Sequence, residues 1–475
     1  MRKPFTHIRS ITPGLSNLKA MVLATSYITI FVVSIILSHP VWSFYMLVVI
    51  VLALNVYLAY NHPVLTVVLI IFLSVIHQNL IHFYPDITLI FRAGEFNLRP
   101  WDPLLFGVFV TLLLKHMLNN YQLKQSMLRY FPLLTLLFVL LILHIIRSIG
   151  VYGARHSLGE FRTYYSYLFM VPYVAIFCRT SEQRLRMLKA LMLLTFSIIV
   201  LAFLTGLLAP KISFGVKWLN AHGMLAVLYG LVVLLVVMNR RILKLNPALI
   251  ILTALAGGFL IIFTAHRSVW LASAVALLSL YALREIKFTR QLQVAFIAIA
   301  VGVVAYFALS RAGYVPNEFI ESRLYAFTNP KQDPTASWRL YLWQESIDGI
   351  RHNPWLGNGL GKHFELIGPA GDIIMTSPHN LYVSIPFQIG IPGLVLYLAF
   401  IAMLFFRYMQ SRAKRYIPAS DHVILTLGVV VLITAHAFYV AYPMEGDWVT
   451  WVYIGLAASV LVNRRIHFLK GKSNE

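Results

Sequence analysis

Apolar stretches of about 20 residues recur along most of this chain. Each stretch is long enough to cross a bilayer as one helix, because a helix rises about 1.5 Å per residue and the hydrocarbon core is about 30 Å thick. Of the 475 residues, 59% are hydrophobic and 12% are charged, whereas a soluble domain has about 45–50% and 25%. The sequence therefore predicts an all-α fold, a polytopic transmembrane helical bundle.

We expect about 12 to 14 spans, since some neighbouring stretches have almost nothing between them. The candidate spans are 20–38, 41–60, 63–82, 103–118, 130–147, 163–178, 187–208, 219–238, 247–265, 267–284, 292–309, 391–407, 421–440 and 448–463. Segment 310–378 is the one long stretch of mixed composition between them.

The formal net charge of +22 is typical of the positive-inside rule, by which Lys and Arg gather in the cytoplasmic connections of a membrane protein. With the N-terminus in the cytoplasm, every dense basic cluster falls on the cytoplasmic side, so we expect no nucleic-acid partner. We divide the chain into N-terminal transmembrane helices (1–309), a large periplasmic loop with short helices (310–378), and C-terminal transmembrane helices with a cytoplasmic tail (379–475).

The sequence has no pattern typical of a metal or cofactor site. Cys178, the single cysteine, provides neither an internal disulfide nor a set of metal ligands. His, Asp and Glu do not occur with metal-ligand spacing, and no pair of outer carboxylates has the spacing of a glycosidase. We therefore expect chemistry that uses neither a metal nor a cofactor.

Two arginines stand where outer segments enter the membrane. Arg267 lies in FTAHRSVWLASA between two apolar stretches, and Arg162 lies in GEFRTYYSYLF at the start of another. Charged groups at membrane depth are costly and often functional, and a guanidinium fits two phosphate oxygens at once. Two structural roles stay open, because Arg267 could snorkel to lipid headgroups and Arg162 could simply pair with Glu160.

The span that begins with WLNAHGMLAVLYG also starts with polar residues, Asn220 and His222, and their role has two possible interpretations. They are candidates for substrate binding or no more than a polar helix end. In the large loop, ASWRLYLWQESIDGIRHNPWLG predicts an amphipathic helix that carries Arg339 and stops at Pro354.

A glycine-rich stretch, PWLGNGLGKHF, follows that helix. Backbone N–H groups in such a stretch can hold phosphate. The spacing differs from a dinucleotide-binding fingerprint and no βαβ unit surrounds it, so the pattern favours a set of tight turns.

SPHNLYVSIPFQIGIPG places His379 and Asn380 directly before another span. Asn380 is expected to cap the helix that follows. Histidine is the side chain best suited to move a proton near neutral pH, although a satisfied polar group at the interface is the ordinary alternative. Arg and His together suit glycosyl transfer, in which Arg holds a phosphate leaving group and His deprotonates an attacking hydroxyl.

The order of these motifs resembles the O-antigen ligase and Wzy-type polymerase superfamily. The matching segments are FRTYYSYLF, LNAHGMLAVLYG, TAHRSVWLASA, SWRLYLWQESI, NPWLGNGLG and SPHNLYVSIPFQIGIPGLVLYL. The resemblance implies a metal-independent glycosyltransferase of the GT-C type in the bacterial inner membrane, with its active site facing the periplasm. It also implies an undecaprenyl-diphosphate-linked glycan as donor, and lipid A-core or another glycan as acceptor.

By the same resemblance, His379 is the general base, and Arg162 and Arg267 hold the diphosphate. We therefore expect these three side chains to lie together around a cavity. The remaining candidates for substrate binding are Arg339, Asn380, Asn220 and His222.

Two other functions stay open at this point. A polymerase of O-antigen, capsule or exopolysaccharide units would use the same chemistry, and the product distinguishes it from a ligase. A flippase or transporter of lipid-linked glycans would belong to another class. Transporters often have repeated halves, and we find no such repeat, so the one large outer loop favours an enzyme.

Overall fold

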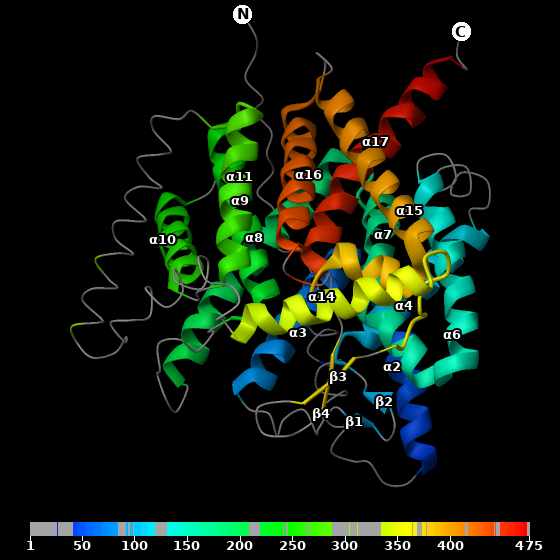
Figure 1. Cartoon of the computed structure of the whole chain (residues 1–475). Helices are drawn as coiled ribbons and strands as arrows, with labels where there is room; N and C mark the ends of the chain where they lie inside the picture. Colours follow the sequence, from blue (N-terminus) through cyan, green and yellow to red (C-terminus); the bar gives the residue numbers. More distant parts are fainter. Residues whose placement is uncertain are drawn as a thin grey trace, which may run out of the picture.

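The computed structural model shows helices that run roughly side by side, with one helix, α14, lying across their ends (Figure 1). The residues described are 26, 41–83, 92–93, 96–97, 99–118, 131–208, 219–240, 242–243, 246–263, 266–286, 304, 311, 334–362, 364–367, 373–376, 378–413, 417–440, 442 and 447–472. The predicted spans 20–38 and 292–309 fall almost wholly outside these residues.

The helices follow the apolar stretches closely. They are α2 (Val41–Asn61), α3 (Pro63–Phe83), α4 (Asp102–Leu118), α6 (Pro132–Tyr164), η2 (Ser166–Phe169), α7 (Met170–Phe177), α8 (Ser181–Leu208), α9 (Ala221–Arg240), α10 (Pro247–Phe263), α11 (Arg267–Ala282), α14 (Pro334–His352), α15 (Leu381–Arg412), α16 (Ala419–Phe438) and α17 (Trp448–Lys472). Among the described residues, five of them (α6, α8, α9, α15 and α16) are long and apolar enough to cross a membrane. The prediction of an all-α polytopic membrane protein is confirmed.

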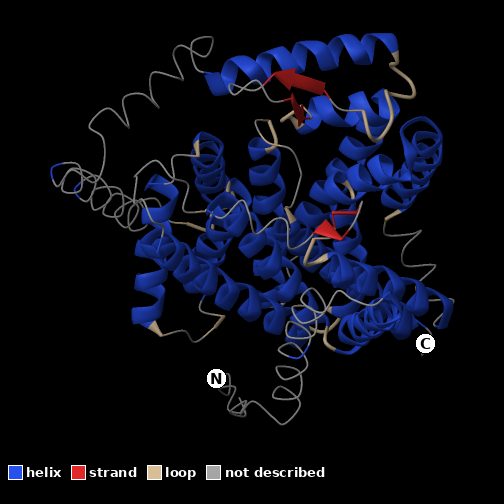
Figure 2. Ribbon diagram, turned by 90° about the horizontal axis from the view of Figure 1, so that it is seen from below, coloured by secondary structure: helices blue, strands red, loops and turns tan. Residues whose placement is uncertain are grey.

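Two short antiparallel hairpins were not predicted. One pairs β1 (Arg92–Ala93) with β2 (Phe96–Asn97), and the other pairs β3 (Phe364–Ile367) with β4 (Ile373–Thr376). The second joins FELI to IIMT, two runs rich in β-branched and aromatic residues that favour strands. Figure 2 shows its strands beside the long helix that lies across the bundle.

Several predicted spans differ in extent from the helices that form, and three of these differences change the architecture. The span 130–147 continues to Tyr164 as α6, which bends at Gly153, where φ is 81°. The span 163–178 is divided between η2 and the short α7. The span 391–407 begins earlier, because α15 starts at Leu381 and bends at Gly390, where φ is 77°.

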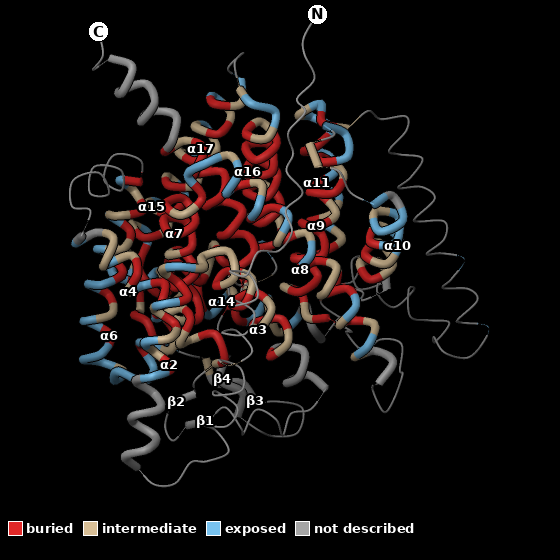
Figure 3. The backbone as a smooth tube through the Cα atoms, turned by 180° about the vertical axis from the view of Figure 1, so that it is seen from behind, coloured by how far each residue is buried: buried red, intermediate tan, exposed pale blue. Residues whose placement is uncertain are grey.

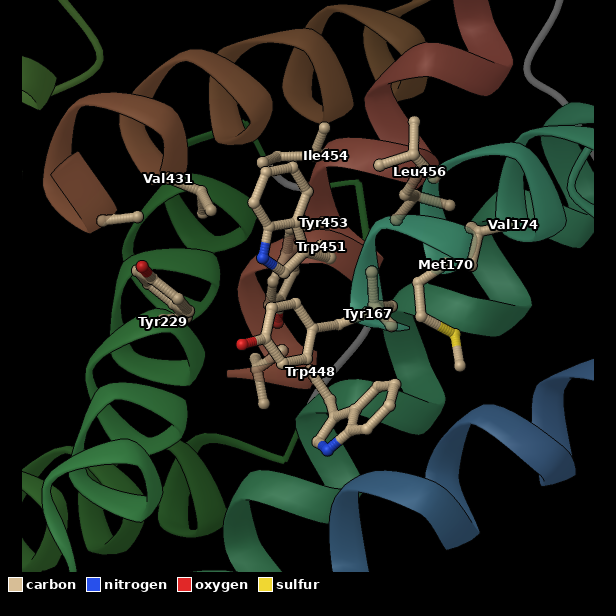
Figure 4. Close-up of a cluster of buried hydrophobic side chains, with 14 of the residues drawn as sticks. Tyr167, Met170, Val174, Tyr229, Val431, Trp448, Trp451, Tyr453, Ile454 and Leu456 are labelled. Atoms are coloured by element: carbon tan, nitrogen blue, oxygen red, sulfur yellow. The ribbon is translucent and has the colours of Figure 1, made fainter. Parts of the chain in front are cut away.

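The short helix α7 lies in the centre of the bundle. All residues from Met170 to Ile176 are buried, as expected of a helix that is apolar on every side. Its main neighbour is α17, and the two helices approach so closely that a Cβ at Gly455 would lie 2.9 Å from the carbonyl oxygen of Met170. Figure 4 shows the aromatic side chains around this contact, where the rings of Tyr167 and Trp448 meet edge to face at 5.4 Å.

Apolar side chains also cover outer helices of the bundle. On α6, Leu143 and Ile146 are 59% and 64% exposed, and Ile251 on α10 is 59% exposed. Figure 3 shows exposed residues along both helices. Apolar faces of this extent are costly in water and stable in lipid, which agrees with a membrane protein.

One end of the bundle is held together by ion pairs between basic connections that were predicted to share one side. Arg184 pairs with Asp421 at 2.6 Å, and the buried Glu285 pairs with Arg240 at 2.9 Å and Arg412 at 3.1 Å. Burial acts against the charged form of Glu285, yet the hydrogen bonds from both arginines keep its pKa below the ordinary value. We call this end, defined by these five residues, the basic end.

Candidate functional site

The opposite end of the bundle brings together a group of aromatic, imidazole and guanidinium side chains around Tyr442. This residue lies between the end of α16 and the start of α17. Its ring stacks on Phe438, with 4.9 Å between ring centroids and 18° between ring planes. We call the group around Tyr442 the Tyr442 cluster. Its other members are His222, His266, Arg267, Trp338, Arg339 and His379.

His379 lies in this cluster, directly before α15. Its imidazole meets the ring of Trp338 edge to face at 5.0 Å and the ring of Tyr442 at 6.4 Å. Its buried Nδ1 has no hydrogen-bond partner among the residues that the structure describes. Burial, together with the charge of Arg339, lowers the pKa of His379 to about 4. The imidazole is therefore neutral near pH 7 and able to accept a proton.

Helix α14 supplies Trp338 and Arg339, as the sequence predicted for the amphipathic helix of the large loop. The buried Leu342 and Ser346 lie one and two turns further on and mark the face by which α14 packs against α15. The guanidinium carbon of Arg339 is 5.3 Å from the ring centroid of Tyr442, within the range of a cation–π contact.

Arg267 reaches the same cluster as the first residue of α11. Burial raises the pKa of the Tyr442 phenol, while Arg339, by charge and hydrogen bond, and Arg267, by charge, act in the opposite direction. His266, the residue before Arg267, forms a hydrogen bond of 3.1 Å between its Nε2 and the carbonyl oxygen of Leu219. This bond connects the start of α11 to the start of α9.

At that start, His222 joins the cluster and Asn220 caps the helix. The ring of His222 meets Tyr442 at 6.0 Å and Phe438 at 5.7 Å, both edge to face. The side-chain oxygen of Asn220 accepts a hydrogen bond from the N–H of Gly223 at 2.6 Å. Asn380 has the corresponding position on α15, where its side chain accepts from the N–H of Tyr382 at 2.9 Å, as predicted.

Arg162 is held by a carboxylate from another helix. It forms an ion pair of 2.8 Å with Asp102 at the start of α4, and not the pair with Glu160 that the sequence left open. Glu160 instead accepts a hydrogen bond of 2.8 Å from Gln388. Arg99 lies nearby and donates to Thr163, the neighbour of Arg162 in the chain. Helix α4 thus carries the carboxylate that holds Arg162, and the expectation that Arg162, Arg267 and His379 lie together around a cavity stays a prediction.

The segment that carries Tyr442 is fastened at both ends. Tyr439 donates a hydrogen bond of 2.6 Å to the carboxylate of Asp447, which also accepts from the N–H of Thr450. Burial raises the pKa of Asp447, and these hydrogen bonds oppose that rise. The carbonyl oxygen of Tyr439 accepts from the N–H of Leu381 at 3.1 Å, so the same turn also fixes the start of α15 beside His379.

The glycine-rich stretch after α14 forms tight turns, as its glycine spacing predicted. The N–H groups of Asn358 and Gly359 donate to the carbonyl oxygens of Phe387 and Gln388 at 2.6 and 3.0 Å. The N–H of Leu360 donates to Ser148 at 2.8 Å. These donors are engaged within the protein, so this stretch joins α14 to α6 and α15 and holds α14 in place.

Sequence reasoning missed Tyr442 and Asp447 and gave His266 no role. The signal was present in FYVAYPMEGDW, a short connection with aromatic, Gly and acidic residues on the predicted outer side. This connection joins the predicted spans 421–440 and 448–463, and outer loops often carry function.

The fold and the Tyr442 cluster define a helical membrane protein with a basic and imidazole-containing site at one end of the bundle. Residues 252–398, which include α11, α14 and the start of α15, match the family model described as O-Antigen ligase. A curated relative, "O-antigen ligase" from Pseudomonas aeruginosa, is 26% identical over 131 residues. That alignment covers 27% of this chain and 32% of the relative. Over residues 252–398 the chain is therefore similar to the O-antigen ligase family, which supports the resemblance noted in the sequence.

Proposed function

We propose that this chain is a glycosyltransferase that moves a glycan from undecaprenyl diphosphate to an acceptor hydroxyl, and that it acts as an O-antigen ligase with lipid A-core as acceptor. The observation that carries the proposal is the neutral imidazole of His379, whose buried Nδ1 has no partner among the described residues, beside the guanidinium of Arg339. A base next to a fixed positive charge is what such a transfer needs.

In the proposed reaction, His379 accepts the proton of the acceptor hydroxyl while the hydroxyl oxygen attacks the anomeric carbon of the donor sugar. The bond between that carbon and the diphosphate oxygen breaks, and undecaprenyl diphosphate leaves with the electron pair. Arg267 and Arg339, whose charges both act on Tyr442, stabilise the negative charge of the leaving diphosphate. His222, whose ring meets that of Tyr442 at 6.0 Å, contacts the donor sugar or its phosphate.

The leaving group also affects the base. In the free protein, burial and the charge of Arg339 disfavour the protonated form of His379. A diphosphate bound to Arg339 and Arg267 places negative charge beside the imidazole, which raises its pKa and lets it hold the proton during the reaction. Donor binding therefore prepares the base.

We place the site on the periplasmic side of a bacterial inner membrane. The support is its position at the end of the bundle opposite the basic end, since Lys and Arg mark the cytoplasmic side. In this arrangement α14, the helix of the loop 310–378, supplies Trp338 and Arg339, between the helices of 1–309 and those of 379–475. Arg162, which pairs with Asp102, stays a candidate for holding the diphosphate of the donor.

The test is a transfer assay with the purified full chain in detergent, an undecaprenyl-diphosphate-linked glycan and lipid A-core. We expect glycan to appear on lipid A-core without ATP, and the rate to be unchanged by EDTA. Longer lipid-linked chains without transfer to lipid A-core would identify a polymerase. No product in either assay, with a donor that binds, would contradict the proposed chemistry and leave a transporter.

A further inference from the structure

A groove of about 690 Å³ lies between α3 and α8, well away from the Tyr442 cluster. The residues that α8 contributes recur every three or four positions, so they form one face of the helix. They are Gln183, Arg186, Ala190, Leu193, Leu194 and Ser197. Helix α3 contributes Pro63, Val64, Leu65, Val68 and Phe72, and among these Val64, Val68 and Phe72 are spaced by four. The groove therefore follows two neighbouring helices along their length.

Polar and apolar residues are separated along this groove. Asn61 and His62, in the turn between α2 and α3, lie at one end with Arg186. The rest of the groove is lined mainly by apolar side chains such as Phe72 and Leu194. The polar end is part of the basic end of the bundle, because Arg184, on the same turn of α8 as Arg186, pairs there with Asp421.

The length of the groove matches half a bilayer. From Arg186 to Ser197 the helix advances 11 residues, or about 16 Å at 1.5 Å per residue. Half of the hydrocarbon core measures about 15 Å. Leu193 is 65% exposed, so the groove opens outward along its length, where lipid surrounds the bundle. An occupant that begins at the polar end would reach the middle of the membrane.

The polar end carries positive charge. The ammonium of Lys115 lies 4.2 Å from the ring centroid of Tyr60 and 5.5 Å from that of Phe177, and both rings line the groove. Arg186 pairs with Glu182 across an exposed contact of 3.0 Å. Among the described residues, Glu182 is the one carboxylate that forms an ion pair with Lys115 or Arg186. These two cations and one carboxylate leave a net positive charge for an anionic headgroup.

We propose that this groove binds one phospholipid with an anionic headgroup, from the leaflet at the basic end. One acyl chain lies between α3 and α8, and the phosphate contacts Arg186, with Lys115 adding long-range attraction. Basic groups close to a headgroup favour anionic lipids in this way. This lipid site is separate from the proposed transfer reaction and does not depend on it.

The test uses the full chain in nanodiscs of phosphatidylcholine that contain a small share of photoreactive lipid. The photoreactive group is a diazirine in the acyl chain, on either phosphatidylglycerol or phosphatidylcholine, and the labelled residues are mapped by mass spectrometry. With phosphatidylglycerol we expect about fivefold more labelling of the groove residues of α3 and α8 than with phosphatidylcholine.

Three variants separate the headgroup from the acyl chain. Arg186→Gln is expected to remove the preference for phosphatidylglycerol while labelling of the groove persists. Ala190→Trp fills the groove and is expected to abolish its labelling with both lipids. Leu204→Trp, on an exposed part of α8 that does not line the groove, is the matched control and is expected to behave as the unaltered chain.

Equal labelling with the two lipids in the unaltered chain would overturn the proposal, as would groove labelling that Ala190→Trp leaves unchanged. If Ala190→Trp does not fold, Arg186→Gln still decides, because Arg186 is an exposed residue whose substitution leaves the packing intact. A preference for phosphatidylglycerol that survives Arg186→Gln would also contradict the assigned headgroup contact.

Discussion

The imidazole of His379 stands at 89° to the indole of Trp338, with 5.0 Å between the ring centroids. This contact joins α14, which lies across the bundle, to the start of α15. An aromatic edge-to-face pair has a defined geometry, so the indole fixes the direction in which the imidazole nitrogens point.

Trp338→Ala is therefore expected to lower kcat of glycan transfer by about 100-fold, because a displacement of about 1 Å of the base has an effect of this size. Trp338→Phe keeps a ring in place and should retain most activity. Trp355→Ala is the matched control, since Trp355 is 73% exposed in the same loop. Steady-state kinetics in detergent measure all three. Full activity of Trp338→Ala would show that the indole does not orient the base.

The pH dependence of kcat/KM reports the free enzyme and should reveal His379. With a pKa of about 4, the imidazole is neutral above that pH, so activity should fall only as pH drops through about 4. Arg339→Gln removes the positive charge that contributes to this low pKa, so the acidic limb of the profile should move to higher pH.

Arg351→Gln is the control for this profile, because Arg351 is an exposed residue of the same helix that pairs with Asp348. In Arg351→Gln, the acidic limb of the kcat/KM profile should lie at the same pH as in the unaltered chain. An acidic limb that does not move in Arg339→Gln would contradict the electrostatic contact between Arg339 and His379, whatever the absolute activity of that variant.

Arg267→Lys keeps the positive charge and loses the planar fork that binds two phosphate oxygens. We expect donor KM to rise by about 10- to 100-fold, the equivalent of one lost charge-assisted hydrogen bond. Arg351→Lys should leave donor KM unchanged. Donor titration in detergent provides the measurement, and unaltered donor affinity in Arg267→Lys would remove Arg267 from diphosphate binding.

Gly390→Ala tests how the loop helix is held in place. The backbone at Gly390 has φ of 77°, and a Cβ there would collide with the carbonyl oxygen of Trp355. We expect the variant to lose about 1–3 kcal/mol of stability and to release the turn that follows α14. Thermal unfolding and limited proteolysis after residue 352 measure both effects. Gly150→Ala is the control, because nothing lies within 4 Å of a Cβ at that position. If Gly390→Ala and Gly150→Ala had equal stability and equal cleavage rates, this would contradict the close approach of Gly390 to the backbone of Trp355.

Much of the fold could be predicted because membrane helices must satisfy their own backbone hydrogen bonds and cover themselves with apolar side chains. This requirement leaves a direct signal in sequence, and α2, α3 and α9 begin and end within a few residues of their predicted spans. The division of 163–178 into η2 and α7 could not be predicted. Hydropathy does not distinguish a segment that faces lipid from one that is buried against α17.

The candidate site was predictable in part for a similar reason. His379 and Arg267 stood out because polar groups are rare where apolar stretches begin, whereas Arg339 stood out as part of the amphipathic helix in the large loop. Tyr442 did not stand out, because an aromatic residue is ordinary at a membrane interface and its role appears only when three helix ends meet around it. The partner of Arg162 was equally hidden, since Asp102 lies 60 positions away in the chain.

The most direct measurement for the central claim is the turnover number of His379→Ala in the purified transfer assay, with donor binding measured on the same sample. We expect a loss of about 10²- to 10⁴-fold in kcat, with donor affinity and thermal stability close to those of the unaltered chain. Turnover within tenfold of the unaltered chain, in a folded sample that binds donor, would show that His379 is not the base.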